Sequence, residues 1–266
     1  PSMPTRRADA GIAVVNGKIY VIGGNDGSVE DKTEEYDPAT DKWNGRRNMP
    51  TDRKNLSAAA VAGKIYAMGG TTGSSAVRTN EVYDPVADTW TTRSSMLTAR
   101  MWFAGQTVGD KIYALGGYTG SASLTAAEMY DPAANTWTAR AVLPAGIDSM
   151  ASAVLGNRIY LVSGFQGTTP VKSVSVYDTV NNAHSALADY PMAANEPAAA
   201  ATLGRLFVMG GDNNASTYYA HHYQFDPGVA TPVATAVDDA TGAAPLGAGF
   251  RSGWITFDLT TLVQEW

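Results

Sequence analysis

The sequence predicts an all-β protein made of repeated four-stranded units, because three columns of residues return every 46 to 48 residues. The first column is a glycine pair after an apolar strand, at Gly23-Gly24, Gly69-Gly70, Gly116-Gly117 and Gly210-Gly211, with Ser163-Gly164 in the fourth place. The second is Tyr36-Asp37-Pro38, Tyr83-Asp84-Pro85, Tyr130-Asp131-Pro132, Tyr177-Asp178-Thr179 and Phe225-Asp226-Pro227. The third is Trp43, Trp90, Trp137 and then His184.

Each unit is expected to contain four strands. The first is rich in small residues, as in 56–61, and a two-residue turn such as Asn16-Gly17 joins it to the second. The second strand ends at the glycine pair, where glycine allows unusual backbone angles and close approach of other chain segments. The third ends at Asp-Pro, which cannot continue a ladder, and the fourth begins near the tryptophan. No segment carries a sustained helical period.

This pattern resembles the Kelch repeat. The residues that carry the resemblance are the glycine pairs and the Tyr–Trp pairs seven residues apart, Tyr36 with Trp43, Tyr83 with Trp90, and Tyr130 with Trp137. The resemblance covers about residues 3–230. It implies a single Kelch-type β-propeller domain over residues 1–266, with four-stranded antiparallel blades around a central channel and the tyrosines and tryptophans between adjacent blades.

The number of blades depends on the C-terminal residues. Five clear repeats occupy about residues 3–235, and residues 236–266 do not fit a sixth at full length. The segment 254–259 imitates the third-strand column, and Trp266 can take the place of the tryptophan. We therefore expect six blades with a degenerate, shortened sixth. The alternative is five blades followed by a C-terminal extension.

The composition limits the classes of partner that the protein is expected to bind. The formal net charge is −6 and no run of lysine or arginine stands out, which disfavours a nucleic-acid partner. No apolar stretch is long enough to span a membrane, and the chain has no cysteine. The chain begins at Pro1 without a methionine, which is compatible with a removed signal peptide or flanking domains. We expect a monomer or part of a larger polypeptide. The location is not determined; the Ala, Gly, Thr and Ser-rich surface gives a slight preference for an exported bacterial protein.

The candidate binding site lies on one face of the repeats. In an up-and-down blade, the loop after the glycine pair and the loop that joins successive blades lie on the same side, and loops on a rigid scaffold are common binding positions. The ligand-binding residues predicted on this face are Arg7, Arg53, Arg100, Trp102, Tyr118, Asp148, Phe165, Glu196, Asp212 and Asn213. Guanidinium groups and aromatic rings predict a protein, peptide or acidic glycan ligand. The alternative for the arginines, which recur with the repeat, is that they brace neighbouring blades.

Catalytic chemistry is less well supported than binding. No catalytic residue, metal site or cofactor is predicted: the repeated aspartates sit in turns, and no zinc spacing or nucleophile elbow occurs. The family that the chain resembles also includes enzymes. A galactose-oxidase-like copper enzyme needs a Tyr–Cys crosslink, which a chain without cysteine cannot form. A sugar-modifying enzyme similar to sialic-acid mutarotases stays open as the alternative function.

Overall fold

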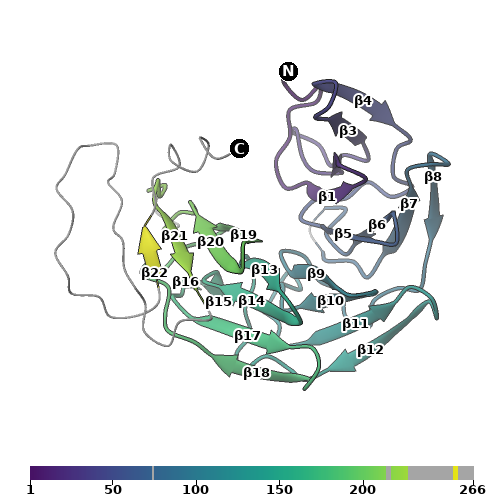
Figure 1. Cartoon of the computed structure of the whole chain (residues 1–266). Helices are drawn as coiled ribbons and strands as arrows, with labels where there is room; N and C mark the ends of the chain where they lie inside the picture. The colour runs from purple at the N-terminus through teal and green to yellow at the C-terminus, as the bar shows by residue number, and fades with distance from the viewer. Residues whose placement is uncertain (74, 214–216, 227–253, 257–266) are drawn as a thin grey trace. The chain divides into compact units, whose positions relative to one another are not determined.

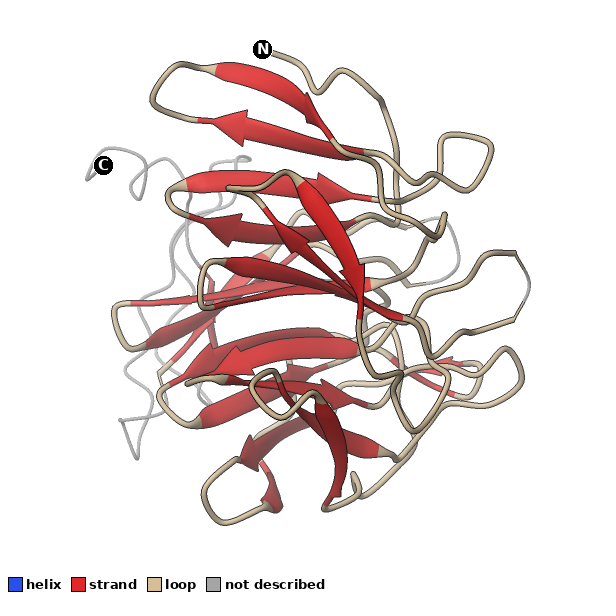
Figure 2. Cartoon of the chain, turned by 90° about the vertical axis from the view of Figure 1, so that its right-hand side faces the viewer, coloured by secondary structure: helices blue, strands red, loops and turns tan. Residues whose placement is uncertain are grey.

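The computed structural model describes residues 1–73, 75–213, 217–226 and 254–256. They form strands and loops, with no helix in these ranges (Figure 2). The strands make five four-stranded antiparallel sheets in which sequence neighbours lie side by side, the blades of a β-propeller (Figure 1). The all-β fold class and the four-stranded blades predicted from the sequence are therefore confirmed.

The first compact unit, Pro1–Asp148, contains three blades. Their strands are β1 (Gly11–Val15), β2 (Lys18–Ile22), β3 (Thr33–Asp37) and β4 (Lys42–Arg46); β5 (Ser57–Val61), β6 (Lys64–Met68), β7 (Asn80–Asp84) and β8 (Thr89–Thr92); and β9 (Ala104–Val108), β10 (Lys111–Leu115), β11 (Ala127–Asp131) and β12 (Thr136–Arg140). The turn between β1 and β2 has positive φ at Asn16 and Gly17, 52° and 74°, as a type I′ hairpin requires.

The second compact unit, Ser149–Trp266, contains the fourth and fifth blades. Their strands are β13 (Ala151–Leu155), β14 (Arg158–Val162), β17 (Val174–Asp178) and β18 (Ala183–Ala186), with the short hairpin β15 (Phe165–Gln166) and β16 (Thr169–Pro170); and β19 (Ala198–Thr202), β20 (Arg205–Met209), β21 (His222–Phe225) and β22 (Trp254–Thr256).

The C-terminal strand corrects one expectation. Trp254–Thr256 was expected to form the third strand of a sixth blade, but β22 pairs antiparallel with β21, with Trp254 opposite Phe225. It is the outermost strand of the fifth blade, so that assignment was wrong. Pairing with the free edge of β21 explains why, because an unpaired strand edge offers a row of backbone donors and acceptors. The rest of the predicted sixth blade, within residues 236–266, lies outside the described residues.

The glycine pairs hold successive blades together. Gly69 has φ of 58°, and a Cβ atom there would lie 2.5 Å from the carbonyl oxygen of Arg100 in the connection to the next blade. The N–H of Gly70 donates to that carbonyl at 2.9 Å. Side chains are excluded here because the two backbones touch. In the fourth blade Ser163 takes the glycine position, and its Oγ lies 2.8 Å from both the N and the O of Ala194.

The repeated aromatic residues pack between blades, as expected. Trp137 is 9% exposed, packs against Tyr130 with 5.0 Å between ring centroids, and donates from Nε1 to the carbonyl oxygen of Ser94 at 2.8 Å. Tyr130 donates its hydroxyl to Asn135 at 2.7 Å. His184, which stands in the tryptophan column, packs on Tyr177 with centroids 4.7 Å apart.

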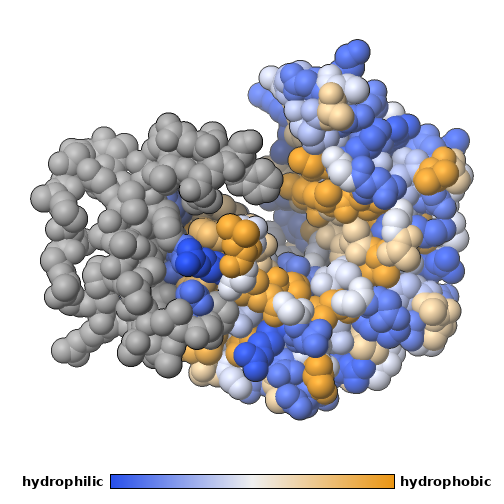
Figure 3. Space-filling view, in the orientation of Figure 1, coloured by the Kyte–Doolittle hydropathy of each residue, from blue (hydrophilic) through white to orange (hydrophobic). Residues whose placement is uncertain are grey.

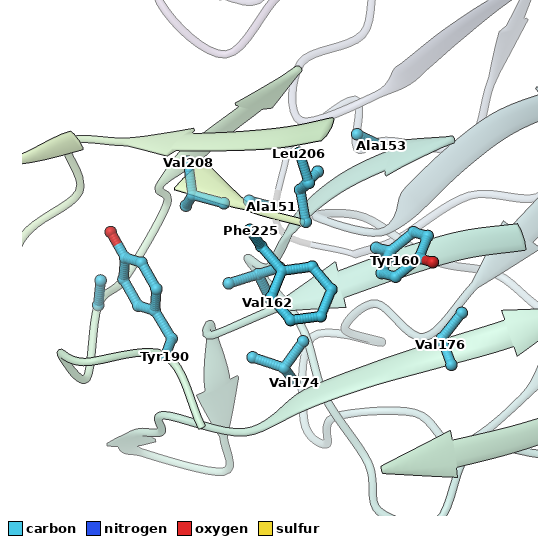
Figure 4. Close-up of a cluster of buried hydrophobic side chains, with 11 residues drawn as sticks. Ala151, Ala153, Tyr160, Val162, Val174, Val176, Tyr190, Leu206, Val208 and Phe225 are labelled. Atoms are coloured by element: carbon cyan, nitrogen blue, oxygen red, sulfur yellow. The ribbon is translucent and has the colours of Figure 1, made fainter. Parts of the chain in front are cut away.

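The core of the second unit is a separate apolar cluster. Figure 4 shows Phe225 of β21 lying against Val162 and Val174 of the fourth blade, with Tyr160 on one side. Tyr190 and Leu206 belong to the same cluster and are essentially unexposed. The fourth and fifth blades are thus joined by apolar side chains from both sheets.

The repeated aspartates cap turns on the hairpin-turn side, as predicted. Asp84 Oδ1 accepts hydrogen bonds from the backbone N–H groups of Val86 and Ala87, at 3.0 and 3.2 Å, and Oδ2 pairs with Lys64 at 2.9 Å. Exposed apolar residues are also found in these turns, and Figure 3 shows hydrophobic side chains interspersed with hydrophilic ones over the visible face. No helix in the described residues is long and apolar enough to cross a membrane.

The first blade holds a buried carboxylate, Glu35, at a position where the second and third blades have Val82 and Met129. Glu35, with a side chain 1% exposed, accepts hydrogen bonds from Tyr20, Lys18 and Arg46 at 2.8, 2.8 and 2.9 Å. Burial alone would raise the pKa of Glu35, but the hydrogen bonds from Lys18, Tyr20 and Arg46 outweigh it and the pKa is lowered. The carboxylate therefore stabilises the folded state at neutral pH.

Glu35→Gln is expected to flatten the acid limb of the stability curve. A folded-state pKa below the unfolded value of about 4.3 gives stabilisation that is present above that value and lost as the pH falls through the folded pKa. Urea unfolding at intervals from pH 7 to pH 3 measures the slope, with exposed Asp52→Asn as the control. Equal slopes in Glu35→Gln and the parent would contradict this assignment.

Candidate functional site

The two loops expected on one face lie together in each unit. In the first, second, third and fifth blades, an isolated β-bridge joins a residue of the segment that enters the blade to the residue after the blade's glycine pair. The bridges are Ala8 with Asn25, Lys54 with Thr71, Met101 with Tyr118, and Asn195 with Asp212. They extend the blades beyond their glycine pairs, so the face named from the sequence, which we call the loop face, has an ordered backbone.

One column of the loop face has left-handed backbone in all five blades. Its members, with φ of 50° to 59°, are Asp9, Asn55, Trp102, Ser149 and Glu196. Within the units their backbones are linked from blade to blade: Asn55 N donates to Asp9 O at 2.9 Å, Trp102 N to Asn55 O at 3.1 Å, and Glu196 N to Ser149 O at 3.1 Å. This conformation suits asparagine and aspartate, but it is uncommon for a residue as bulky as tryptophan.

Two of the predicted ligand-binding arginines are buried within their own blades. Arg53 is unexposed and donates to the carbonyl oxygens of Gly69 and Ala67, at 2.7 and 3.2 Å, and to the Glu81 carboxylate at 2.8 Å. Burial lowers the pKa of Arg53, and the neighbouring Glu81 carboxylate opposes that shift. The ordinary guanidinium value lies so far above neutrality that Arg53 stays charged.

Arg100 repeats the arrangement in the third blade. It is unexposed and donates to the carbonyl oxygens of Gly116 and Ala126, at 2.6 and 2.9 Å, and to Glu128 at 2.5 Å. Arg7 in the first blade donates to Val21 O at 3.0 Å, pairs with Glu34 at 3.1 Å, and has an unexposed side chain. These contacts make the arginines braces inside their own blades rather than between neighbouring blades, as the alternative had it, and neither Arg53 nor Arg100 presents surface to a ligand.

The acidic partners of these arginines were missed by sequence reasoning. Glu34, Glu81 and Glu128 recur at an interval of 47 residues in the third strands. Both columns break together: where Ile147 and Ala194 replace arginine, Ser175 and Tyr223 replace glutamate. The simultaneous loss of arginine and glutamate in the same repeats is the sequence signal that could have revealed the ion pairs. A buried charge needs a partner, so the two residues are kept or lost together.

The third blade gathers several predicted site residues into one cluster. Trp102 and Tyr118 are half-buried, and their rings lie 6.0 Å apart at 43°. Tyr118 pairs in a bridge with Ser123, whose Oγ donates to Asp148 at 2.6 Å. We call Trp102, Tyr118, Ser123 and Asp148 the loop-face cluster. It combines aromatic surface with a hydroxyl and a carboxylate that is 5% exposed.

The remaining predicted residues lie in the second unit. Asp212 accepts from Asn195 Nδ2 at 3.3 Å, and Asn213 N donates to Thr217 O at 3.1 Å. Glu196 is exposed, and Phe165 is half-buried in β15. The structure does not show these four side chains converging on one another. Tyr218, 82% exposed, bridges with Asp212 and was not predicted.

The positions of the histidine, aspartate and glutamate side chains bear on metal binding. In the described ranges, no three histidine, aspartate or glutamate side chains come close enough together to hold a metal ion. The chemistry of the loop-face cluster is that of a recognition surface: ring faces for stacking, and oxygen atoms for accepting hydrogen bonds.

Comparison with known proteins identifies the repeats. The Kelch motif matches residues 6–50, 52–97, 103–141 and 149–189. Among solved structures, that of YjhT superposes with a TM-score of 0.74 at 14% sequence identity, over 83% of this chain and 81% of that one, which shows a common fold. No curated protein sequence matches the chain. Four consecutive motif matches across more than half of the residues show that the chain belongs to the Kelch-motif family.

Proposed function

We propose that this Kelch propeller is a binding module whose ligand docks on the loop-face cluster. The observation that carries the proposal is the Trp102–Tyr118 pair, two partly exposed aromatic rings 6.0 Å apart on backbone that is held by bridges. Trp102 keeps a large side chain at a left-handed position, with φ of 52°, where such side chains cost stability. A binding role for that ring offers a reason for the cost.

The ligand we favour is a glycan with free hydroxyl groups. Aromatic rings stack on apolar faces of sugars, and the Asp148 carboxylate accepts hydrogen bonds from hydroxyl donors. The acidic ligand expected from the sequence depended on the arginines, and the guanidinium groups of Arg53 and Arg100 are already bound to Glu81 and Glu128. The cluster therefore supports a neutral ligand better than an anionic one.

Trp102→Ala and Tyr118→Ala are each expected to weaken glycan binding by about 1–3 kcal/mol, the usual cost of truncating an anchor in a binding surface. The probe is the oligosaccharide that gives the strongest signal on an array of neutral glycans, with affinity then measured by calorimetry. Melting temperatures report whether each variant is folded.

Val86→Ala is the control, because Val86 is 90% exposed in a hairpin turn remote in sequence from the cluster. Unchanged affinity in both aromatic variants would refute the loop-face site. A signal confined to peptide arrays, lost in the same variants, would keep the site and overturn the ligand class.

A further inference from the structure

We propose that the second blade carries an anion site, formed by Lys64, Tyr66 and Arg93, that takes a small carboxylate ion from outside the chain. Lys64 and Tyr66 lie in β6, and Arg93 follows directly after the end of β8. None of the three belongs to the loop-face cluster, so the site is independent of the proposed function. Its chemistry is visible in the first blade, where the same kinds of side chain hold a carboxylate of the chain itself.

The first blade shows the three donors with their carboxylate in place. Lys18 Nζ lies 2.8 Å from Glu35, the Tyr20 hydroxyl donates to Glu35 at 2.8 Å, and Arg46 pairs with it at 2.7 Å. The glutamate side chain is 1% exposed. Ammonium, hydroxyl and guanidinium together therefore hold one buried carboxylate.

The second blade keeps the donors and lacks the carboxylate. Lys64, Tyr66 and Arg93 follow their first-blade counterparts by 46 or 47 residues. The glutamate position is taken by Val82, which lies opposite Tyr66 on one side and Thr91 on the other. Arg93 is two residues beyond Thr91, so its side chain leaves the same face of the blade as Val82. The three donors and the apolar replacement thus share one face.

The guanidinium of Arg93 is left without a partner. It makes no hydrogen bond or ion pair with any described residue, and its Nε is buried and unbonded. A guanidinium has five N–H donors, and a buried donor without an acceptor costs free energy. The third-blade counterpart, Arg140, contacts the sulfur atom of Met129 at 2.7 Å. Of the three arginines at this position of the repeat in the first unit, only Arg93 has its side chain unpaired among the described residues.

The two cationic groups act on the tyrosine hydroxyl. Burial raises the pKa of Tyr66, and the charges of Arg93 and Lys64 act against that shift. Lys64 pairs with Asp84 at 2.9 Å and its side chain is 43% exposed. Its first-blade counterpart contacts two carboxylates at once, so the existing pair does not prevent Lys64 from attracting a second anion.

These features define the chemistry of the ligand. A guanidinium pairs with a carboxylate through parallel hydrogen bonds, and the hydroxyl and ammonium groups supply further donors. Arg93 is half-buried, so an ion can reach it from solvent. Val82 is 4% exposed and fills the inner part of the position, which favours a small ion. Acetate fits these conditions, because it has the head group of a glutamate side chain without the chain behind it.

The experiment is a titration of the isotope-labelled full chain with sodium acetate at constant ionic strength, followed by proton–nitrogen NMR spectra that include the arginine Nε–Hε signals. We expect a saturable shift of the Arg93 signal and of backbone amides near Val82. The Arg46 signal should stay in place, because that guanidinium is already bound to Glu35. Equal shifts with sodium chloride would show an adventitious ion only, and an Arg93 signal that does not move with acetate would likewise overturn the site.

Matched substitutions test the donors separately, with backbone amides as the readout. Arg93→Gln should raise the Kd for acetate about tenfold or more, and Tyr66→Phe about fivefold, as expected for loss of hydrogen bonds to a charged group. Arg78→Gln removes an exposed arginine of the same blade and should leave the Kd unchanged. Dispersed spectra establish folding of each variant. An unchanged Kd in folded Arg93→Gln would refute the proposal.

Val82→Glu supplies the carboxylate from within the chain. The substitution copies the first blade, so the new carboxylate should pair with Arg93 and move its Nε–Hε signal without acetate. Added acetate should then cause no further shift. A folded Val82→Glu protein that binds acetate as tightly as the parent would contradict the site, and if this variant does not fold, Arg93→Gln decides.

Discussion

Arg100→Ala is expected to lower the free energy of unfolding by about 3–5 kcal/mol, the cost of removing one partner of a buried ion pair. The substitution leaves the Glu128 carboxylate, 2% exposed, without the guanidinium that neutralises it. It also removes the donor shared by the carbonyl oxygens of Gly116 and Ala126. Urea unfolding followed by tryptophan fluorescence measures the loss.

The repeat itself supplies the control for this prediction. Ile147 and Ser175 hold the equivalent positions where the pair is absent, so Arg100→Ile combined with Glu128→Ser copies an arrangement already present in the chain. The double variant should lose less stability than Arg100→Ala, because no buried charge remains unpaired. A single variant that loses under about 1 kcal/mol would show that the pair is not buried in solution.

Trp137→Ala is expected to cost about 3–5 kcal/mol, the usual range for truncating a buried large aromatic residue. Trp137 is 9% exposed, packs on Tyr130, and donates to Ser94 O at 2.8 Å. The truncation opens a cavity in the contact with the second blade and leaves a carbonyl group without its donor. Thermal and urea unfolding measure the cost.

Trp90→Ala provides the comparison. Trp90 makes the same kind of bond, to Arg47 O at 2.8 Å, but its side chain is half-buried, so its loss should be smaller. Equal losses at the two positions would mean that the hydrogen bond, rather than burial, dominates. Losses below about 1 kcal/mol at both would contradict the packing of these residues between blades.

The fold was predictable because it depends on local, repeated signals. Glycine pairs, Asp-Pro turns and Tyr–Trp spacing each specify backbone geometry within one unit. Because the pattern occurs five times, a residue that departs from it in one unit does not hide it. The exceptions were harder to interpret. Trp254 begins a strand whose short sequence suits either a third or a fourth strand, and only pairing with Phe225 decides which.

The candidate site was less predictable because its residues depend on contacts between distant segments. From the sequence alone, a loop arginine that binds a ligand cannot be told from one that pairs with a residue of its own chain. Arg53 pairs with Glu81, which lies 28 residues away in the sequence. Loop positions alone predicted that Trp102 and Tyr118 share one face, whereas the contact between their rings and the bridge between Met101 and Tyr118 are seen only in the structure.

The division of contacts between side chain and main chain has a consequence for how repeat proteins gain or lose repeats during evolution. Arg53 and Glu81 lie in one repeat, so a cut between residues 51 and 52 separates no buried ion pair. Some joins across that cut are made by two peptide groups, such as Gly24 N to Arg53 O and Asn55 N to Asp9 O, and others use a side chain, such as Trp90 Nε1 to Arg47 O. Peptide groups are the same whatever the side chain. Duplication or loss of a whole repeat in a gene therefore preserves the charge balance within each blade and the peptide joints between blades, and leaves the side-chain joints and the apolar fit as the contacts that selection must restore.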